Sequence, residues 1–252
     1  VYKDKDLWNN NKKFLGGISL MNWNNQMMEK LEWNSEIKNK EEKQKIAFKI
    51  AEKVKEGEVI GFGSGSTSFL AVCAIADRIK EEKIHITAIP TSHEIKMLCS
   101  YFNIPTCTLL EKKPDWCFDG ADEVDKQGWL IKGRGAAMFQ EKLNMVSANK
   151  TFILIDESKI VSKLGEKYPI PIECYPNSML YVKEKLFQMG AKEIKLRKAV
   201  AKDGPVITEN GNFILDTKFK VINENLEKQI KCISGVIETG LFIGYDLSLI
   251  HN

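Results

Sequence analysis

Short apolar runs alternate with longer amphipathic segments between residues 58 and 155, and this alternation constrains the fold more than any other feature of the chain. Strand patterns lie at 58–62, 84–89, 104–109, 115–118 and 151–155, and helical patterns at 67–82, 92–102 and 134–149. Strands that alternate with helices form parallel sheets that helices cover on both faces. The pattern therefore predicts a large α/β domain, preceded by a helix that ends at Gly57.

The rhythm changes after about residue 168. Strand and helix patterns then follow in the order β-α-β-β-α-β, which is typical of a split-βαβ, ferredoxin-like unit. Within "PVITENGNFIL", Asn210-Gly211 predicts a hairpin with a type I′ turn. We therefore expect an α+β domain at 168–235, inserted into a larger domain formed by 35–167 and 236–252. The last strand pattern, "GVIETGLFI", fits either sheet.

The composition and charge of the chain exclude several classes of protein. Residues 1–34 are rich in Asn, Lys and Trp and predict a poorly ordered leader. A net charge of +3 disfavours a dedicated nucleic-acid binder, and no apolar run is long enough to span a bilayer. The six cysteines form no CxxC pair and the three histidines lie far from any cysteine pairing, so we expect free thiols, no zinc site and a cytoplasmic location.

Polar segments follow four of the predicted strands. They read "GSGST", "PTSHE", "DGADEVD" and "DESK", and a fifth, "IKGRGAAMFQEKL", opens a helix close to the acidic one. Ligands of parallel sheets bind beyond the carboxyl ends of the strands. Because right-handed crossovers bring those ends to one edge, the segments are expected to line one cleft.

The glycine-rich segment "GFGSGST" is not a nucleotide-binding loop. Ser66 stands where a dinucleotide fingerprint needs its third glycine, and no lysine follows Gly65 as in an NTPase phosphate loop. Backbone N–H groups at a helix N-terminus, with the hydroxyls of Ser64, Ser66 and Thr67, suit a phosphate monoester. The alternative is a plain turn in which Ser66 or Thr67 caps the helix.

The acidic segment "DGADEVD" places Asp119, Asp122, Glu123 and Asp125 within seven residues. Two unit charges about 4 Å apart repel by about 4 kcal/mol at an effective dielectric constant near 20. If the carboxylates converge, a metal, a lysine or sugar hydroxyls must offset this repulsion. The spacing is not that of an EF-hand loop, and a solvated acidic turn is the alternative.

The segment "KGRGAAMFQEKL" supplies a lysine, two glycines and a glutamate. Gly133 and Gly135 allow backbone amides to approach a ligand closely. The helical neighbours of Glu141 are apolar, and partial desolvation would move its carboxyl group towards the strength of a general base. Both Glu141 and Lys159 could equally be ordinary surface residues.

These segments, in this order and spacing, closely resemble the type A ribose-5-phosphate isomerase family. "ILD" at 214–216 and "GVIETGLF" at 235–242 add to the resemblance, which runs from about residue 40 to 246. It implies a Rossmann-like domain with an inserted α+β domain. It also implies interconversion of ribose 5-phosphate and ribulose 5-phosphate in the non-oxidative pentose phosphate pathway, without metal or nucleotide cofactor. Such an enzyme would be a cytoplasmic homodimer or homotetramer with a sugar phosphate as substrate.

Matched residue by residue, the resemblance makes Glu141 the general base. Asp119 is the candidate for opening the sugar ring, and Lys132 would stabilise an ene-diolate. Which lysine serves the phosphate and which the oxyanion stays open. The other substrate-binding residues implied are Ser64, Gly65, Ser66, Thr67, Gly120, Ala121, Asp122, Gly133, Arg134, Gly135 and Lys159.

Two positions depart from the family pattern, which usually has Thr at Ser64 and Gly at Arg134. Ser64 keeps the hydroxyl group. At Arg134, a need for positive φ would strain the chain by about 1–2 kcal/mol, so we expect the position to tolerate a side chain. Two other functions remain: another sugar-phosphate isomerase or deaminase, and a non-catalytic sugar-phosphate sensor. A sensor would ordinarily carry a DNA-binding module, and no helix-turn-helix pattern is evident.

Overall fold

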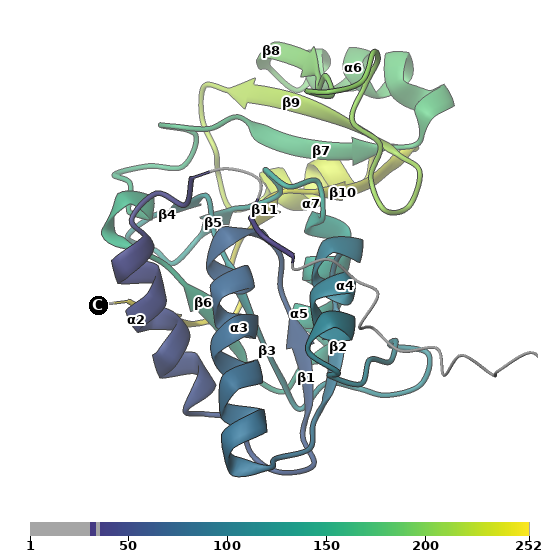
Figure 1. Cartoon of the computed structure of the whole chain (residues 1–252). Helices are drawn as coiled ribbons and strands as arrows, with labels where there is room; N and C mark the ends of the chain where they lie inside the picture. Colours follow the sequence, from purple (N-terminus) through teal and green to yellow (C-terminus); the bar gives the residue numbers. More distant parts are fainter. Residues whose placement is uncertain (1–30, 34–35, 252) are drawn as a thin grey trace, which may run out of the picture.

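The structure, a computed structural model, describes residues 31–33 and 36–251 (Figure 1). The leader expected at 1–34 lies outside the described residues except for 31–33. There Trp33 is partly buried, and its ring lies 5.5 Å from that of Phe69. Within the described part of the chain, no helix is long and apolar enough to cross a membrane.

The first sheet is parallel, as the alternation predicts. Its strand order is β12-β6-β3-β1-β2. The strands are β1 (Val59–Phe62), β2 (Thr87–Pro90), β3 (Trp116–Gly120), β6 (Thr151–Leu154) and β12 (Ser248–Ile250).

Two details of this sheet differ from the prediction. The strand expected at 104–109 does not form, because only a single bridge joins Thr106 to Ala88 and Pro105 has no N–H to donate. Strand β12 was not expected, and it adds the C-terminal segment to the edge of the sheet beside β6.

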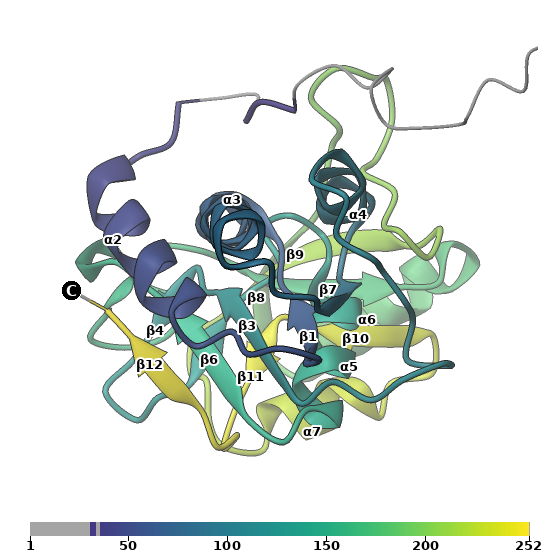
Figure 2. The same ribbon diagram turned by 60° about the horizontal axis from the view of Figure 1, so that its bottom comes forward.

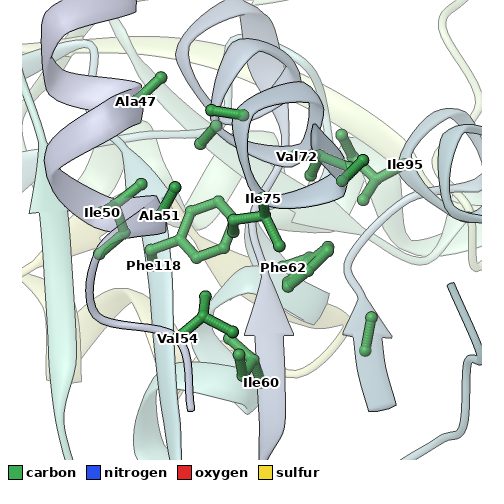
Figure 3. Close-up of a cluster of buried hydrophobic side chains, with 14 of the residues drawn as sticks. Ala47, Ile50, Ala51, Val54, Ile60, Phe62, Val72, Ile75, Ile95 and Phe118 are labelled. Carbon is green, nitrogen blue, oxygen red and sulfur yellow. The ribbon is translucent and has the colours of Figure 1, made fainter. Parts of the chain in front are cut away.

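Helices cover both faces of this sheet, as Figures 1 and 2 show. On one face lie α2 (Lys40–Ala51), α3 (Gly65–Glu82) and α4 (His93–Tyr101), and on the other α5 (Met138–Ser147). Phe62 and Phe118 point into the first layer, where they pack with Ile75 in a buried cluster (Figure 3). Side chains of a strand alternate between faces. Gly61 and Cys117 therefore face α5, where Asn144 lies against them.

The second sheet is antiparallel with the order β10-β7-β9-β8. Its elements follow the chain as β7 (Ile170–Cys174), α6 (Met179–Gln188), β8 (Ala191–Leu196), β9 (Phe213–Phe219), α7 (Leu226–Lys231) and β10 (Val236–Thr239). This is the expected β-α-β-β-α-β pattern. Because β10 pairs with β7, the sheet extends beyond the boundary expected at residue 235, and the division into two domains stays a prediction.

A small third sheet joins the two larger ones. It has the order β11-β5-β4, with β4 (Glu123–Val124), β5 (Leu130–Ile131) and β11 (Leu241–Phe242). The segment "GVIETGLFI" therefore contributes to two sheets: β10 to the second and β11 to the third. Two short 3-10 helices, Glu157–Lys159 and Pro176–Ser178, complete the described elements.

The turn at Asn210-Gly211 is not type I′, which requires positive φ at both residues. Gly211 has φ +78°, but Asn210 is not in the left-handed region. The N–H of Gly211 donates to the carbonyl of Thr208 at 2.9 Å, and that of Thr208 to the carbonyl of Asn212 at 2.9 Å. The turn therefore begins at Thr208, before the expected Asn-Gly pair, and Gly211 adopts the left-handed conformation at its end.

All six cysteines are free thiols. Cys99, Cys117 and Cys174 are buried as expected, whereas Cys232 is exposed. Burial raises the pKa of Cys99 and of Cys117 to about 12, so these thiols stay protonated near neutral pH.

Candidate active site

The carboxyl ends of the parallel strands meet at one edge, as the crossover rule predicts. Ser64, after β1, lies with its Oγ 2.8 Å from Thr91 Oγ1 and 2.8 Å from Ser92 Oγ, both after β2. Its backbone N–H donates to Asp119 Oδ1, at the end of β3, at 3.2 Å. Three of the predicted segments therefore line one site.

Lys132 is the centre of this site. Its Nζ lies 3.0 Å from Asp119 Oδ2 and 3.1 Å from Glu141 Oε2, and it donates a hydrogen bond to the carbonyl of Gly120. The three charged side chains are buried, with exposed fractions of 4% for Lys132, 6% for Asp119 and 7% for Glu141. We call Lys132, Asp119 and Glu141 the charged triad. Its lysine is the group that offsets the repulsion between the two carboxylates.

The backbone fixes two members of the charged triad. Asp119 Oδ1 accepts hydrogen bonds from the N–H of Ser64 and, at 2.7 Å, from that of Gly120. Lys132 follows β5, and its N–H donates to the carbonyl of Gly240 at 2.9 Å. Gly63 makes the approach of the first two loops possible, because a Cβ there would lie 2.3 Å from Asp119 Cγ.

Glu141 lies in the first turn of α5, and its neighbour Lys142 anchors that helix. Lys142 Nζ lies 2.6 Å from Glu227 Oε1 and 2.9 Å from Glu238 Oε1, both in the second sheet's layer. It also donates to the carbonyl of Leu241 at 2.8 Å. These buried contacts fix the position of the helix that presents Glu141 to Lys132.

Burial controls the protonation of the charged triad. Burial and the neighbouring Asp119 raise the pKa of Glu141 to about 8, although Lys132 opposes the shift. Burial likewise raises the pKa of Asp119 against the attraction of Lys132. Burial disfavours the charged form of Lys132, but the two carboxylates outweigh it and raise its pKa. A carboxyl group that titrates near neutral pH beside a fixed cation can accept and return protons.

The other acidic residues of "DGADEVD" do not form a solvated turn. Asp122 Oδ2 accepts a hydrogen bond from the N–H of Arg134 at 3.0 Å. Glu123 is fully buried and accepts from three backbone N–H groups, those of Gly165, Lys167 and Tyr168. Asp125 closes its own turn through the N–H groups of residues 127 and 129. Asp119 therefore lies in the site, and Asp122 contacts the loop that follows Lys132.

The first turn of α3 carries the expected anion-binding features. Ser64 is the N-cap residue, not Ser66 or Thr67, and its side chain makes no capping hydrogen bond. Gly65 has φ +87°. The first N–H groups of a helix have no intrahelical partner and carry partial positive charge. The turn therefore offers N–H groups and hydroxyls to a ligand.

Lys43 was not predicted, yet it lies beside this turn. Its Nζ donates to Ser66 Oγ at 3.2 Å and lies 3.9 Å from Asp156 Oδ2. It is 5% exposed, and burial together with Lys159 lowers its pKa, while Asp156 opposes the shift. In the sequence, Lys43 falls on the same helix face as Ile46 and Ile50. A lysine on a buried helix face is unusual, and this placement could have identified Lys43 as a candidate site residue.

The chain is similar to known proteins over most of its length. A family model described as ribose 5-phosphate isomerase A (phosphoriboisomerase A) matches residues 87–251. The ribose-5-phosphate isomerase A of Methanocaldococcus jannaschii is 44% identical over 216 residues, which make up 85% of this chain and 95% of that protein. The chain belongs to the ribose-5-phosphate isomerase A family.

Solved structures of the ribose-5-phosphate isomerase A family share the fold. That of the M. jannaschii protein has a TM-score of 0.81 at 43% identity, and covers 85% of this chain and 96% of its own. A D-ribose-5-phosphate isomerase solved in complex with phospho-erythronic acid has a TM-score of 0.77 at 39% identity, covering 82% of this chain and 93% of that one. The resemblance inferred from the motifs is thereby confirmed.

Arg134, where the resemblance leads us to expect glycine, is not strained. Gly133 has φ +99°, whereas Arg134 lies outside the left-handed region. Its side chain is exposed, with the guanidinium 5.9 Å from the centre of the Tyr168 ring. The position therefore tolerates a side chain.

Replacing Arg134 by Gly is expected to keep turnover within about threefold of the original, because the residue's backbone N–H, not its side chain, contacts Asp122. Steady-state kinetics on both proteins measure this. A large loss of turnover would show that the guanidinium group itself takes part.

Proposed function

We propose that the chain interconverts D-ribose 5-phosphate and D-ribulose 5-phosphate through an ene-diolate intermediate. The observation that supports this best is the charged triad, in which a glutamate with a pKa of about 8 lies 3.1 Å from a buried lysine. The family relationship supports the same reaction. The reaction moves hydrogen between two adjacent carbons, which requires one base and one site for negative charge.

Each member of the site has a role in this proposal. Asp119 exchanges a proton with the ring oxygen and the anomeric hydroxyl and so opens the sugar ring. Glu141 removes the proton from C2 of the open aldose and returns it to C1, while a proton moves from O2 to O1. Lys132 stabilises the negative charge that forms between these steps. Asp122 orients sugar hydroxyls, and Ser64 to Thr67 receive the phosphate.

We assign Lys43 and Lys159 to the phosphate and Lys132 to the oxyanion. Lys43 contacts Ser66 in the first turn of α3, and the positive charge of Lys159 is near enough to lower the pKa of Lys43. Such neighbouring cations at a helix N-terminus favour a doubly charged phosphate. Lys132 lies between two carboxylates instead, where it already has its counterions.

The Lys43→Met variant is expected to raise KM for ribose 5-phosphate by about 10- to 100-fold and to change kcat less, since a phosphate contact is made in both ground and transition states. The matched control is Lys45→Met, which changes an exposed lysine of the same helix. Steady-state kinetics measure both. A change confined to kcat would contradict the phosphate assignment.

The activity is expected to rise with pH. A general base accepts a proton only when ionised, and the pKa of Glu141 is raised to about 8. Between pH 6.5 and 8, kcat/KM should increase, by about tenfold per unit at the acid end, and level off above the pKa. A flat profile from pH 6.5 to 9 would contradict the role of Glu141.

The deciding experiment adds ribose 5-phosphate in the presence of EDTA and follows ribulose 5-phosphate. We expect product without added metal or nucleotide, which would also test the expectation that no cofactor is needed. Release of ammonia from an amino-sugar phosphate would favour the deaminase alternative, and binding without turnover would favour a sensor. A place in the non-oxidative pentose phosphate pathway, a cytoplasmic location and a homodimer or homotetramer remain part of the proposal.

A further inference from the structure

Arg197, which directly follows β8 of the second sheet, contacts the loop that follows Lys132. Its Nη1 donates to the carbonyl of Gly133 at 2.8 Å and to that of Arg134 at 2.9 Å. One guanidinium group thus holds two consecutive carbonyls of the loop Lys132–Gly135, which we call the lysine-glycine loop. No other side chain of the described residues donates to these two carbonyls.

Arg197 is itself held in place. Its Nε donates to Asp216 Oδ2 at 2.9 Å and its Nη2 to Asp216 Oδ1 at 2.5 Å, a bidentate pair. The two side chains are 16% and 21% exposed. Its backbone N–H also pairs with the carbonyl of Ile214 in β9 at 2.9 Å. Planar bidentate pairs fix the orientation of an arginine, so the contact to the loop has a rigid base.

The two carbonyl contacts, together with the hydrogen bond from the Ala136 N–H to the Gly133 carbonyl at 3.0 Å, determine where the loop's N–H groups point. In a trans peptide, the C=O of one residue and the N–H of the next point in opposite directions. With both carbonyls directed to Arg197, the N–H groups of Arg134 and Gly135 point away from it. The first donates to Asp122 Oδ2 at 3.0 Å. The second donates to no described residue, and a Cβ built on Gly135 meets nothing within 4 Å.

We propose that Arg197, held by Asp216, is a positioning residue for the isomerisation. It orients the peptides of the lysine-glycine loop so that the Gly135 N–H faces the substrate and supports the developing oxyanion beside Lys132. This inference rests on the proposed function. It also gives the second sheet a role in the reaction, since Asp216 lies in β9 and Arg197 directly follows β8.

Lysine at position 197 would keep a positive charge near Asp216. It lacks the planar fork that reaches two carbonyls and both carboxylate oxygens at once. The Arg197→Lys variant is therefore expected to lower kcat by about 10- to 100-fold and to leave KM within about threefold, because the loop's N–H acts mainly in the transition state. The matched control is Lys195→Gln, at an exposed residue of β8 two positions before Arg197, which should leave kcat unchanged.

Two probes separate positioning from a general effect on structure. Phospho-erythronic acid has a carboxylate where the ene-diolate carries charge, whereas ribitol 5-phosphate has no such group. We expect Arg197→Lys to weaken binding of the first about as much as it lowers kcat, and to leave binding of the second unchanged. Equal binding of phospho-erythronic acid by both proteins would overturn the inference, as would a kcat within threefold of the original.

A chemical rescue adds an independent test. Asp122, Arg134, Tyr168, Arg197 and Asp216 line a cavity of about 230 Å³ that gives a small cation access to this position. Millimolar guanidinium should restore part of the kcat of Arg197→Ala but leave Lys195→Gln unaffected. If Arg197→Ala does not fold, as judged by its thermal unfolding, Asp216→Asn replaces it. This variant should lower kcat, weaken binding of phospho-erythronic acid and leave binding of ribitol 5-phosphate unchanged.

The wild-type protein is assayed in parallel, so that different results would overturn the proposed function and the proposed role of Arg197. Wild-type protein that does not convert ribose 5-phosphate would overturn the proposed function. An active wild type with a fully active Arg197→Lys variant would overturn only the role of Arg197.

Discussion

The Glu141→Gln variant is expected to lose about 10³- to 10⁴-fold in kcat and to bind ribose 5-phosphate almost as well as the original protein. Glutamine has nearly the same shape, so the position beside Lys132 stays filled, but its amide cannot accept the C2 proton. General acid–base groups typically contribute this much to a rate. Steady-state kinetics give kcat, and isothermal titration gives the affinity of the inactive variant.

The control for this change is Glu157→Gln, which alters an exposed glutamate near the same edge of the sheet. It should leave kcat unchanged. A Glu141→Gln protein that keeps more than about a tenth of the turnover would show that another group removes the proton. Solvent hydrogen exchange at C2 of the substrate should disappear together with turnover, because both need the same base.

The same substitution should change how stability depends on pH. The pKa of Glu141 is raised from an ordinary value of 4.5 to about 8, so between these values the folded state holds a proton that the unfolded state has lost. The free energy of unfolding of the original protein therefore falls as pH rises through this window. Glutamine has no such dependence. Relative to the original, the variant should gain about 3–5 kcal/mol between pH 4.5 and 8, at about 1.4 kcal/mol per pKa unit.

Urea unfolding at several pH values measures this difference. A constant difference in the free energy of unfolding between the two proteins would show that the carboxyl group is not desolvated. If Glu141→Gln is inactive and more stable than the original protein at pH 8, the carboxyl group of Glu141 lowers the stability of the original protein. Buried charges that a reaction needs commonly have such a cost.

The sequence was sufficient to predict that the loops of the site lie together, but not to predict which of their side chains contact one another. The alternation of strands and helices predicts that the segments after β1, β2 and β3 meet at one edge, and Ser64, Thr91 and Asp119 do meet there. That rule concerns backbone topology. The distances from Lys132 to Asp119 and Glu141 depend on β5 pairing with β11, a contact between segments far apart in the chain.

The residues that sequence analysis missed act across similar separations. Lys43 lies on the buried face of α2 and reaches Ser66 only because α2 packs against α3. Arg197 reaches Gly133 from the second sheet, 64 positions away in the chain. Local patterns describe an element's own periodicity, and they carry no information on which distant loop a long side chain reaches.

The Lys132→Met variant is expected to lose about 10³-fold or more in kcat, because methionine fills a similar volume but leaves the oxyanion without its cation. The loss should also change the pH dependence of any remaining activity. Lys132 holds down the pKa values of Asp119 and Glu141, so without it both rise further and one carboxyl group keeps its proton to higher pH. Residual turnover should therefore have its optimum at a higher pH than that of the original protein.

Stability gives a second measure of the same change. Removing one partner of a buried ion pair typically costs about 3–5 kcal/mol, since the remaining charge has no counterion. In Lys132→Met the cost should be small at pH 5, where Glu141 is protonated, and should grow as pH rises and the two carboxyl groups ionise. Lys126→Met, at an exposed lysine of the neighbouring turn, is the matched control and should show no such dependence.

The two measurements separate the roles of Lys132. A large kcat loss with a pH-independent change in stability would mean that the lysine acts on the substrate alone and not on the protonation of Glu141. A kcat within tenfold of the original would mean that backbone N–H groups of the lysine-glycine loop suffice for the oxyanion. The expected result, loss of turnover together with a pH-dependent loss of stability, would show that one ammonium group serves both as the counterion of the base and as the site for developing charge.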